Sequence, residues 1–460
     1  MATEARLPGS FRDPSGFLFT RSGILYRQVN RVYQAHYDLL LSSGLYDRLV
    51  TEGSLIPHRE AEVASAQPEV AYKVLQPEPV RFISYPYEWC FGQYKAAALA
   101  TLKLQRRALE HGMCLKDASA YNIQFHHGRP MLIDTLSFEP YREGEPWVAY
   151  RQFCQHFLAP LALMARVDIR LSQLLRVYVD GVPLDLASAL LPWRTRLSPS
   201  LQLHLHSHAR AQARYAQEQA KPKGARVSRL ALLGLIDSLQ SSVRGMRWSA
   251  GGTEWADYYA ETSYTAAGAE AKSKLVGEYL ERAAPRTVWD LGANTGKYSR
   301  LAPSGAFTVA FDVDPAAVER NYREMVKAKE VGLLPLVLDL TNPSAGIGWA
   351  NAERSSLTER GPADAALALA LLHHLAISNN VPFAKIAAFL RRLCSWLVIE
   401  FVPKEDPQAQ RLLVTREDIF NEYTRAAFEQ EFGRHFNVVA SSPIPDSARV
   451  LYLMQAREPQ

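Results

Sequence analysis

A glycine-containing loop near position 290 has the residue types and spacing of a ligand-binding turn. A short apolar run ends in Asp290, and Gly292 and Gly296 follow before a segment that can begin a helix. Glycines let the backbone turn sharply and approach a ligand closely. A phosphate-binding P-loop is excluded, because only three residues separate the glycines and a tyrosine follows Lys297. The loop also lacks the middle glycine of a dinucleotide-binding fingerprint. A tight turn that binds no ligand remains an alternative.

Further strands after this loop also end in residues that can contact a ligand. Runs of apolar residues lead to Asp312, to Asp339 and to the pair His373 and His374. Helical segments alternate with these strands. Near the end of the chain, a helix over residues 415–434 and two more strands are expected. Near-continuous apolar strands indicate a parallel sheet with helices on both faces. Ligands of such sheets bind beyond the carboxyl ends of the strands, so these residues are expected to meet there.

This order of strand ends resembles the class I S-adenosylmethionine (SAM) methyltransferases, over residues 251–460. The resemblance implies a Rossmann-like, doubly wound α/β domain with SAM as its cofactor. It implies that Asp290 holds the amino group of SAM and that Asp312 accepts from the ribose hydroxyls. Asp339 and Leu340 are expected beside the adenine.

The resemblance also assigns a role to the loop backbone. Gly292 and Gly296 would allow the methionyl part of SAM to approach. Asn294 stands where the family has its middle glycine. Asparagine also reaches positive φ, so we expect the loop to keep its shape. SAM needs neither a metal nor a covalent intermediate, and no metal site is predicted.

The methyl acceptor is less well defined. The residues after the fourth strand are Leu-Leu-His-His-Leu and not Asn/Asp-Pro-Pro-Tyr/Phe, which disfavours amine methylation of nucleic acids or glutamine. A Pro-Cys nucleophile for cytosine is absent there too. His373 or His374 could act as general base toward an oxygen acceptor, or the pair could only shape the loop. Glu400 is a weaker polar candidate.

The first half contains a second pattern, Asp117 followed by Asn122, a short hairpin and Asp134. It resembles the catalytic segment of kinase-like folds, such as aminoglycoside phosphotransferases and choline kinases. The upstream layout agrees, with a strand-rich lobe, a hinge near Tyr85 to Trp89 and a helix before the catalytic loop. The resemblance implies an α+β domain over residues 1–216, with Asp117 as base and the other two as magnesium ligands.

Two departures put phosphotransferase activity in doubt. The N-terminal region has no glycine-rich phosphate loop. Lys73 lies too close to the expected hinge to be the phosphate-binding lysine, and Arg27 is only a substitute candidate. A kinase-like domain with a lost or altered reaction, an active kinase and an unrelated structural motif all remain open.

Between the two halves, residues 217–250 are interpreted as a linker followed by a helix, since the linker part is polar and basic with Pro222 and Gly224. Upstream, His204, His206 and His208 alternate in a helix-like stretch. Residues two apart do not share a helix face, so a solvated face is expected and a metal site is not.

Composition places few restrictions on the partners. The chain has 460 residues, a formal net charge of +5 and four scattered cysteines. Two or three domains, a reducing cytoplasm and no dependence on nucleic acid are therefore expected. No secretory signal and no apolar run long enough to span a bilayer are seen.

We therefore predict a SAM-dependent methyltransferase acting on a small-molecule or glycan acceptor, on oxygen. The alternatives are a bifunctional methyltransferase and kinase that modifies a bacterial surface polysaccharide, and a SAM-binding regulatory protein. The chain also resembles nodulation-type and polysaccharide-associated methyltransferases, a similarity that indicates a setting and no acceptor.

Overall fold

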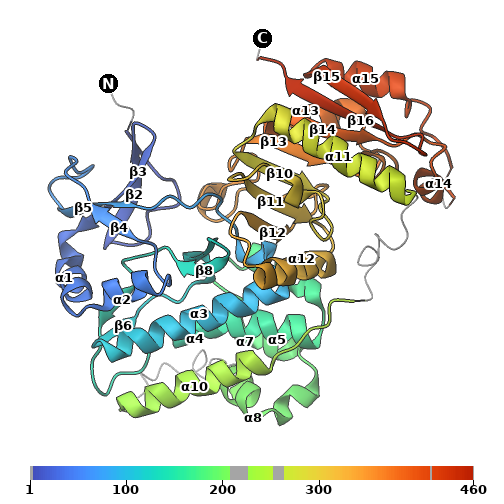
Figure 1. Cartoon of the computed structure of the whole chain (residues 1–460). Coiled ribbons are helices and arrows are strands. Elements are labelled where there is room, and N and C mark those ends of the chain that lie inside the picture. The colour runs from blue at the N-terminus through green and yellow to red at the C-terminus, as the bar shows by residue number, and fades with distance from the viewer. Residues whose placement is uncertain (1–3, 208–225, 252–263, 415–416, 459–460) are drawn as a thin grey trace. The chain divides into compact units, whose positions relative to one another are not determined.

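The computed structural model describes residues 4–207, 226–251, 264–414 and 417–458 (Figure 1). It divides into two compact units. The first comprises Met1–Trp248 and Gly346–Arg354, and the second comprises Ser249–Ala345 and Ser355–Gln460. No helix among the described residues is both long and apolar enough to cross a membrane.

The second unit is built on a seven-stranded sheet. Its strands, in spatial order, are β12 (Leu333–Val337), β11 (Phe307–Asp312), β10 (Thr287–Leu291), β13 (Ala363–Ala368), β14 (Cys394–Phe401), β16 (Val450–Ala456) and β15 (Phe436–Pro443). The first five strands are parallel, and β16 pairs antiparallel with both β14 and β15. The chain leaves β10 toward β11 and β12 on one side and returns to β13 on the other. That reversal is the switch point at which ligands of doubly wound sheets bind.

Helices connect and cover these strands: α11 (Ala266–Ala283), α12 (Pro315–Ala328), α13 (Phe383–Leu393), α14 (Pro407–Leu413) and α15 (Arg425–Gly433). The apolar side of α11 packs on β10, β13, β14 and β16 in one hydrophobic cluster. The expected start of α12 is confirmed, because Asp314 caps the helix by accepting from the Ala316 N–H and Pro315 follows it. The α/β class and the mostly parallel sheet with a final pair of strands are therefore confirmed.

One predicted helix in this unit has the wrong start. A helix over residues 415–434 was expected, but α15 begins only at Arg425 and ends at Gly433. The N-terminal cap explains the later start, because the Thr424 side chain accepts a hydrogen bond from the Ala427 N–H.

The first unit begins with an antiparallel sheet in the order β1 (Glu4–Arg6), β2 (Gly16–Arg21), β3 (Ile24–Asn30), β5 (Ala71–Pro77) and β4 (His58–Glu60). Between β3 and β4 lie α1 (Gln34–Ser42) and α2 (Leu45–Thr51), and the long helix α3 (Phe91–Glu110) follows the sheet. Two small antiparallel pairs come next, β6 (Met113–Leu115) with β9 (Phe138–Pro140) and the hairpin of β7 (Ile123–His126) and β8 (Arg129–Leu132). This strand-rich start followed by a helix and a hairpin has the predicted layout, and its relation to kinases stays a prediction.

The rest of the first unit is helical. Its helices are α4 (Tyr150–Phe153), α5 (Ala159–Arg166), α6 (Leu174–Val177), α7 (Leu184–Leu190), α8 (Pro199–Leu201) and α10 (Arg229–Gly245). The helix α10 follows the predicted linker and packs along α3. Most of the linker itself, residues 217–225, lies outside the described residues.

A short segment between β12 and β13 belongs to the first unit. Glu353 of this segment forms an ion pair with Arg12 at 2.5 Å, and the Arg354 guanidinium lies 4.6 Å from the ring centre of Tyr121. Residues 346–354 are thus packed with the first unit although the sequence on either side belongs to the second.

Candidate functional site at the ends of the parallel strands

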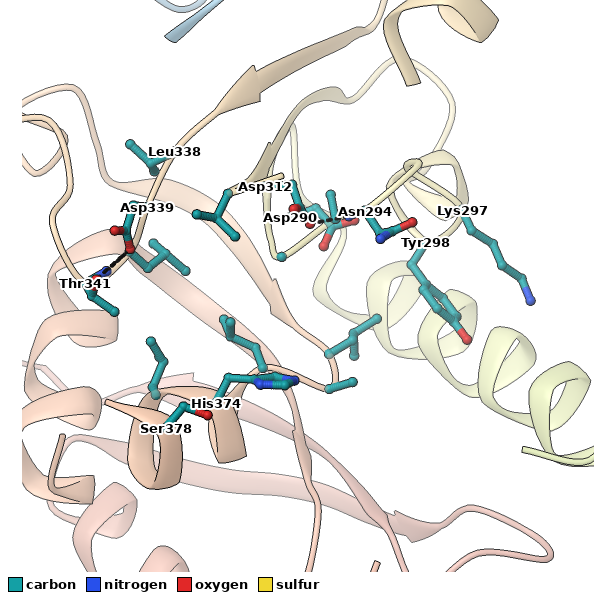
Figure 2. Close-up of a pocket in the computed structure, with 18 of the residues that line it drawn as sticks. Asp290, Asn294, Lys297, Tyr298, Asp312, Leu338, Asp339, Thr341, His374 and Ser378 are labelled. Carbon is teal, nitrogen blue, oxygen red and sulfur yellow. Dashed lines mark hydrogen bonds between the residues drawn. The ribbon is translucent and has the colours of Figure 1, made fainter. Parts of the chain in front are cut away.

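A cavity of about 580 Å³ opens within the second unit at the carboxyl ends of β10, β11, β12 and β13 (Figure 2). Such a volume is typical of small-molecule sites. Most of the residues predicted to bind a cofactor line it: Asp290, Gly292, Asn294, Asp312, Asp339 and Leu340. The fold thus brings together side chains from three successive strand ends. Gly296 is not part of the lining.

The loop after β10 has the backbone that its glycines suggested. The φ angles of Gly292, Asn294 and Gly296 are +81°, +49° and +78°. The expectation that Asn294 takes positive φ in place of glycine is therefore confirmed. A Cβ on Gly296 would lie 2.5 Å from Nδ2 of Asn321 on α12, so this position also needs glycine for space. These two requirements fix the loop against α12.

Asp290 is a buried carboxylate at the end of β10. Its side chain is 2% exposed, and the Ser299 hydroxyl donates to Oδ2 at 2.6 Å. The pKa of Asp290 is raised to about 7, mainly by burial and also by the nearby Asp312, while Ser299 and Lys272 oppose the rise. A cationic ligand group beside Asp290 would favour its charged form.

Asp312 at the end of β11 is held in place by the backbone. The Asn294 N–H donates to Oδ2 at 2.7 Å, and the Asp314 N–H donates to Oδ1 at 2.8 Å. Burial nevertheless raises its pKa to about 6. Each carboxylate oxygen can accept more than one hydrogen bond, so the fixed side chain can still receive ligand hydroxyls.

The third strand end is more open. Asp339 is exposed, and its Oδ1 accepts from both the N–H and the hydroxyl of Thr341 at 2.8 and 2.7 Å. These bonds orient the carboxylate, and the Asp339, Leu340 and Thr341 side chains all border the cavity. The cavity therefore has an apolar side chain, Leu340, next to a hydrogen-bond acceptor, the Asp339 carboxylate.

The two histidines have different surroundings. His374 borders the cavity at the start of the π-helix His374–Ser378 (Figure 2). Burial, together with the charge of Arg449, lowers the pKa of His374 to about 4, so the ring is neutral at pH 7. His373 is fully buried, is not part of the cavity wall, and neither ring nitrogen has a hydrogen-bond partner among the described residues. Of the pair, only His374 is placed to contact a ligand.

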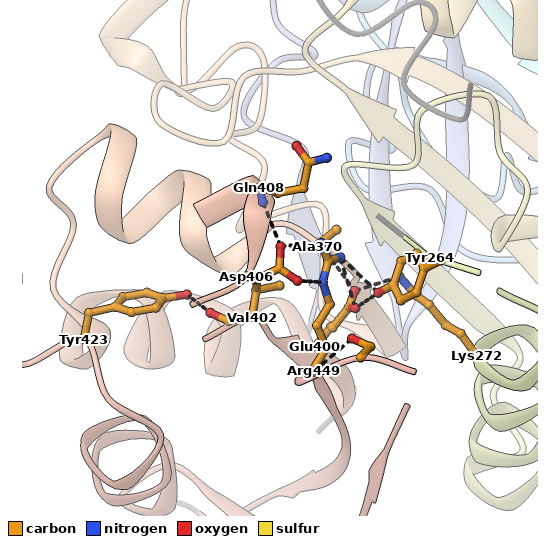
Figure 3. A network of polar contacts seen from close by, with 10 residues as sticks. Tyr264, Lys272, Ala370, Glu400, Val402, Asp406, Gln408, Tyr423 and Arg449 are labelled. Atoms are coloured by element: carbon orange, nitrogen blue, oxygen red, sulfur yellow. Dashed lines mark hydrogen bonds and ion pairs between the residues drawn. The ribbon is translucent and has the colours of Figure 1, made fainter. Parts of the chain in front are cut away.

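A network of buried charges lies beside the cavity (Figure 3). Glu400 on β14 is fully buried and accepts from Lys272 Nζ at 2.7 Å and from the Tyr264 hydroxyl. Arg449 Nη1 lies 3.5 Å from Glu400, and the same guanidinium forms two bonds of 2.7 and 2.9 Å with Asp406. Burial alone would raise the pKa of Glu400, but Lys272 and Arg449 hold it below the usual value. Two cations and two anions thus balance inside the unit.

This network also fixes one wall of the cavity. The Ala370 N–H donates to Glu400 Oε2 at 2.7 Å, and Ala370 has a φ of +50°. Positive φ is strained for alanine, so the bond holds an unfavourable turn four residues before His374. Glu400 was only a weak candidate from the sequence, and Tyr264 and Lys272, which line the cavity, were not expected there. An acidic residue at the end of a buried strand, which requires a partner, was the available signal.

In the first unit, the three kinase-like residues lie close together. Asp117 accepts from the Ser119 N–H and from Gln152, and burial and then Asp134 raise its pKa, with Asn122 near enough to oppose the rise. Asp134 forms a 2.6 Å ion pair with Arg27 of β3. The arrangement therefore gathers two carboxylates, an amide and a guanidinium.

The expectation of a solvated histidine face is wrong for the two described members. His204 and His206 are buried in the π-helix Gln202–His206. The rings bond hydroxyl groups at 2.7 to 3.0 Å, those of Tyr150, Ser238, Ser188 and Thr195. His208 lies outside the described residues.

Comparison with solved structures gives partial overlaps. Magnesium protoporphyrin IX methyltransferase (ChlM) from Synechocystis PCC 6803, with bound SAM, shows 16% identity and a TM-score of 0.29, covering 45% of this chain and 86% of that one. WbdD shows 16% identity and a TM-score of 0.30, and the overlap covers 45% of this chain and 43% of WbdD. The N-methyltransferase NodS from Bradyrhizobium japonicum WM9 shows 12% identity and a TM-score of 0.30, and the overlap covers 42% of this chain and 97% of NodS. These overlaps assign no function to the chain.

Comparison by sequence is more extensive. No family model matches the chain. The nodulation protein NoeA of Rhizobium meliloti (strain 1021) is 38% identical over 463 residues, covering 98% of this chain and 96% of that protein. Similarity of this extent over nearly the whole of both chains shows common family membership. The chain belongs to the family of the nodulation protein NoeA.

Proposed function

We propose that the second unit binds SAM and transfers its methyl group to an oxygen of a small-molecule or glycan acceptor. One observation carries the proposal. A single cavity is lined by the side chains at three successive strand ends, Asp290, Asp312 and Asp339, and by the positive-φ loop between the first two. The resemblance to class I methyltransferases assigns a part of SAM to each of them.

The chemistry of the cavity fits a cation. Asp290 is buried, and its Oδ1 accepts no hydrogen bond within the described residues. An ammonium group is a suitable partner for such an oxygen, because it supplies both charge and donors. Asp290 would therefore hold the amino group of SAM, with Ser299 fixing the carboxylate.

The remaining parts of the ligand have matching partners. Asp312, oriented by two backbone N–H groups, would accept from the ribose hydroxyls. Leu340 would pack on the adenine, and Asp339 would accept from its amino group. The backbone at Gly292 and Asn294 lines the cavity and would allow the methionyl part to approach.

His374 is the side chain we assign to the acceptor. When bound, SAM would supply an electrophilic methyl group: its bond to sulfur would break as the bond to the acceptor oxygen forms, and the hydroxyl proton would pass to water. The neutral His374 ring can accept a hydrogen bond from the acceptor hydroxyl and thereby orient the oxygen. Its low pKa makes it a weak proton acceptor, so we expect positioning to contribute more than full proton transfer.

Calorimetry with SAM and its demethylated product tests the binding step. Wild type is expected to bind both, and Asp312→Asn to bind at least tenfold more weakly, because the amide would turn a donor toward the N–H of Asn294 or Asp314. Glu324→Gln on the exposed side of α12 is the matched control. Absence of saturable binding of either ligand to wild type would refute the proposal.

A screen of acceptor classes with methyl-labelled SAM tests the transfer step. Label is expected in hydroxylated small molecules or glycans. Binding of SAM without transfer to any acceptor would favour the alternative, a SAM-binding regulatory protein.

The second candidate function is phosphotransfer by the first unit. Its supporting observation is the proximity of Asp117 and Asp134, strong enough to raise the pKa of Asp117. The ion pair between Arg27 and Asp134 argues for an altered reaction, because it occupies the carboxylate that would bind magnesium. Binding of ATP that requires Mg²⁺ and is lost in Asp134→Asn would support a bifunctional enzyme. Equal behaviour of Asp134→Asn and wild type would argue against it.

A further inference from the structure

Two histidines and a carboxylate converge at the tip of the β7–β8 hairpin. Glu78, the residue after β5, places Oε1 2.9 Å from His126 Nε2 and 3.2 Å from His127 Nε2. One ligand atom from each of the three residues lies within 4.8 Å of the other two. Glu78 is 48 positions from His126, so no sequence spacing pointed to the cluster.

The hairpin turn is what brings the two histidines together. Neighbouring residues of a regular strand point to opposite faces of the sheet. Here β7 ends at His126, and His127 and Gly128 form a two-residue turn with φ angles of +50° and +74°. The turn folds the second ring back onto the first, with ring centres 4.0 Å apart. The N–H of Glu78 bonds the Pro57 carbonyl at 2.9 Å, which holds the third group in place.

We propose that Glu78, His126 and His127 bind one divalent transition-metal ion of the zinc type. Zinc has ligand distances of about 2.0–2.2 Å and tetrahedral geometry, which place two ligand atoms about 3.3 Å apart. The two distances from Glu78 Oε1 are close to that spacing, so an ion can replace the shared hydrogen bonds with small movements. Water completes the coordination, because the side chains of Glu78 and His127 are 41% and 45% exposed.

The donor set selects the class of ion. Two imidazoles and one carboxylate favour zinc, nickel or copper over magnesium and calcium, which prefer oxygen ligands. Thiolates would compete for zinc, but all four cysteines of the chain are buried. The ion would tie the end of β5 to the hairpin that connects Asn122 with Asp134.

A structural explanation without metal predicts something different. The Glu78–His126 hydrogen bond alone would attach the hairpin to β5, and His127 would then be dispensable. His127→Ala therefore separates the two explanations, since it removes a metal ligand and leaves that bond in place. The side chain is 45% exposed, so its removal leaves no buried void. Because alanine is strained at the positive φ of this position, His127→Asn, which tolerates that φ and lacks the imidazole, is made as a second variant.

Zinc binding is measured on the full-length chain without an affinity tag, by competition with a coloured chelator and by thermal unfolding with and without Zn²⁺. Wild type is expected to bind one ion per chain and to unfold at a higher temperature with Zn²⁺. His127→Ala and Glu78→Gln are each expected to weaken binding at least tenfold and to lose the temperature shift. His435→Ala, which removes a histidine of the second unit, should behave as wild type.

Two results would overturn the proposal. One is the absence of saturable binding by wild type. The other is equal binding by wild type and His127→Ala, which would place any bound ion elsewhere. Cobalt(II) gives an independent readout, because a site with this donor set should produce visible absorption bands that disappear in His127→Ala.

Discussion

Replacement of Glu400 by glutamine is expected to destabilise the second unit strongly, with a dependence on pH. Glutamine has nearly the same shape, so the change removes charge without creating a cavity. Arg449 keeps its two bonds to Asp406. Lys272, which is 2% exposed, loses its 2.7 Å partner and becomes the buried charge without compensation.

The size of the effect has two independent estimates. Removing one member of a buried ion pair typically costs about 3–5 kcal/mol. The variant can also avoid a buried charge by releasing the lysine proton. Doing so at pH 7, about 3.4 units below an unfolded pKa of about 10.4, costs about 4.6 kcal/mol at roughly 1.36 kcal/mol per unit. The cost of releasing the proton is an upper limit on the cost of the unpaired lysine charge, and it agrees with the range for a broken ion pair.

The sign of the pH dependence follows from the protons bound by Lys272. In the variant, burial lowers the pKa of folded Lys272, so the unfolded chain binds more protons between the folded and unfolded pKa values. Stability therefore rises with pH across this range. The upper limit falls to about 1.9 kcal/mol at pH 9.

Calorimetric unfolding of the full chain at pH 7 and pH 9 measures this difference. A loss of about 3–5 kcal/mol lowers the midpoint of a unit of this size by roughly 6–20 °C. Glu278→Gln on the exposed side of α11, in a 3.9 Å surface pair with Lys274, is the matched control and should change the midpoint little. Adding Lys272→Met to Glu400→Gln should recover part of the loss at pH 7.

A loss that is equal at pH 7 and pH 9 would refute this reasoning. So would a double variant no more stable than Glu400→Gln alone, because the uncompensated lysine would then not be the cause.

The affinity for SAM is expected to fall up to tenfold per pH unit below about pH 7, because Asp290 must ionise to hold an ammonium group. Calorimetry across this pH range should find that the affinity of Asp290→Asn does not change slope near pH 7. The same change of slope in the variant and in wild type would contradict the role given to Asp290. Gly296→Ala should cost about 1–2 kcal/mol from its positive φ alone, and more from the contact with α12. Gly277→Ala inside α11, where a Cβ meets open space, should stabilise by about 0.5–1 kcal/mol. The two unfolding midpoints should therefore shift in opposite directions, and shifts of the same sign would contradict one of the two claims. His374→Ala should lower kcat about 10²-fold at unchanged SAM affinity, whereas His373→Leu should keep kcat within a few-fold of wild type. Equal losses of kcat in a labelled-methyl assay would show that both histidines have only a structural role.

The features that could be predicted from the sequence are those that depend on neighbouring residues. The strand ending at Asp290, the glycine loop, and the Asp314 and Pro315 start of α12 are all local patterns. Positive φ at Asn294 could be expected because few residue types tolerate it. Apolar runs also predicted a buried parallel sheet, and the order of its strands brought their ends to one cavity. The helix predicted over 415–434 was given too early a start, because the Thr424 side chain caps α15 at Arg425.

By itself, the sequence determined which strand ends carry carboxylates and how the loop between them turns, because those features follow from residue type and short-range spacing. Only the tertiary structure decided which histidine faces the cavity, since His373 and His374 are adjacent and equivalent as sequence. It also supplied the partners of Glu400, one of which lies 128 positions away. A buried charge is stabilised by groups that the fold brings within about 3 Å, and no local pattern specifies which distant residues those are.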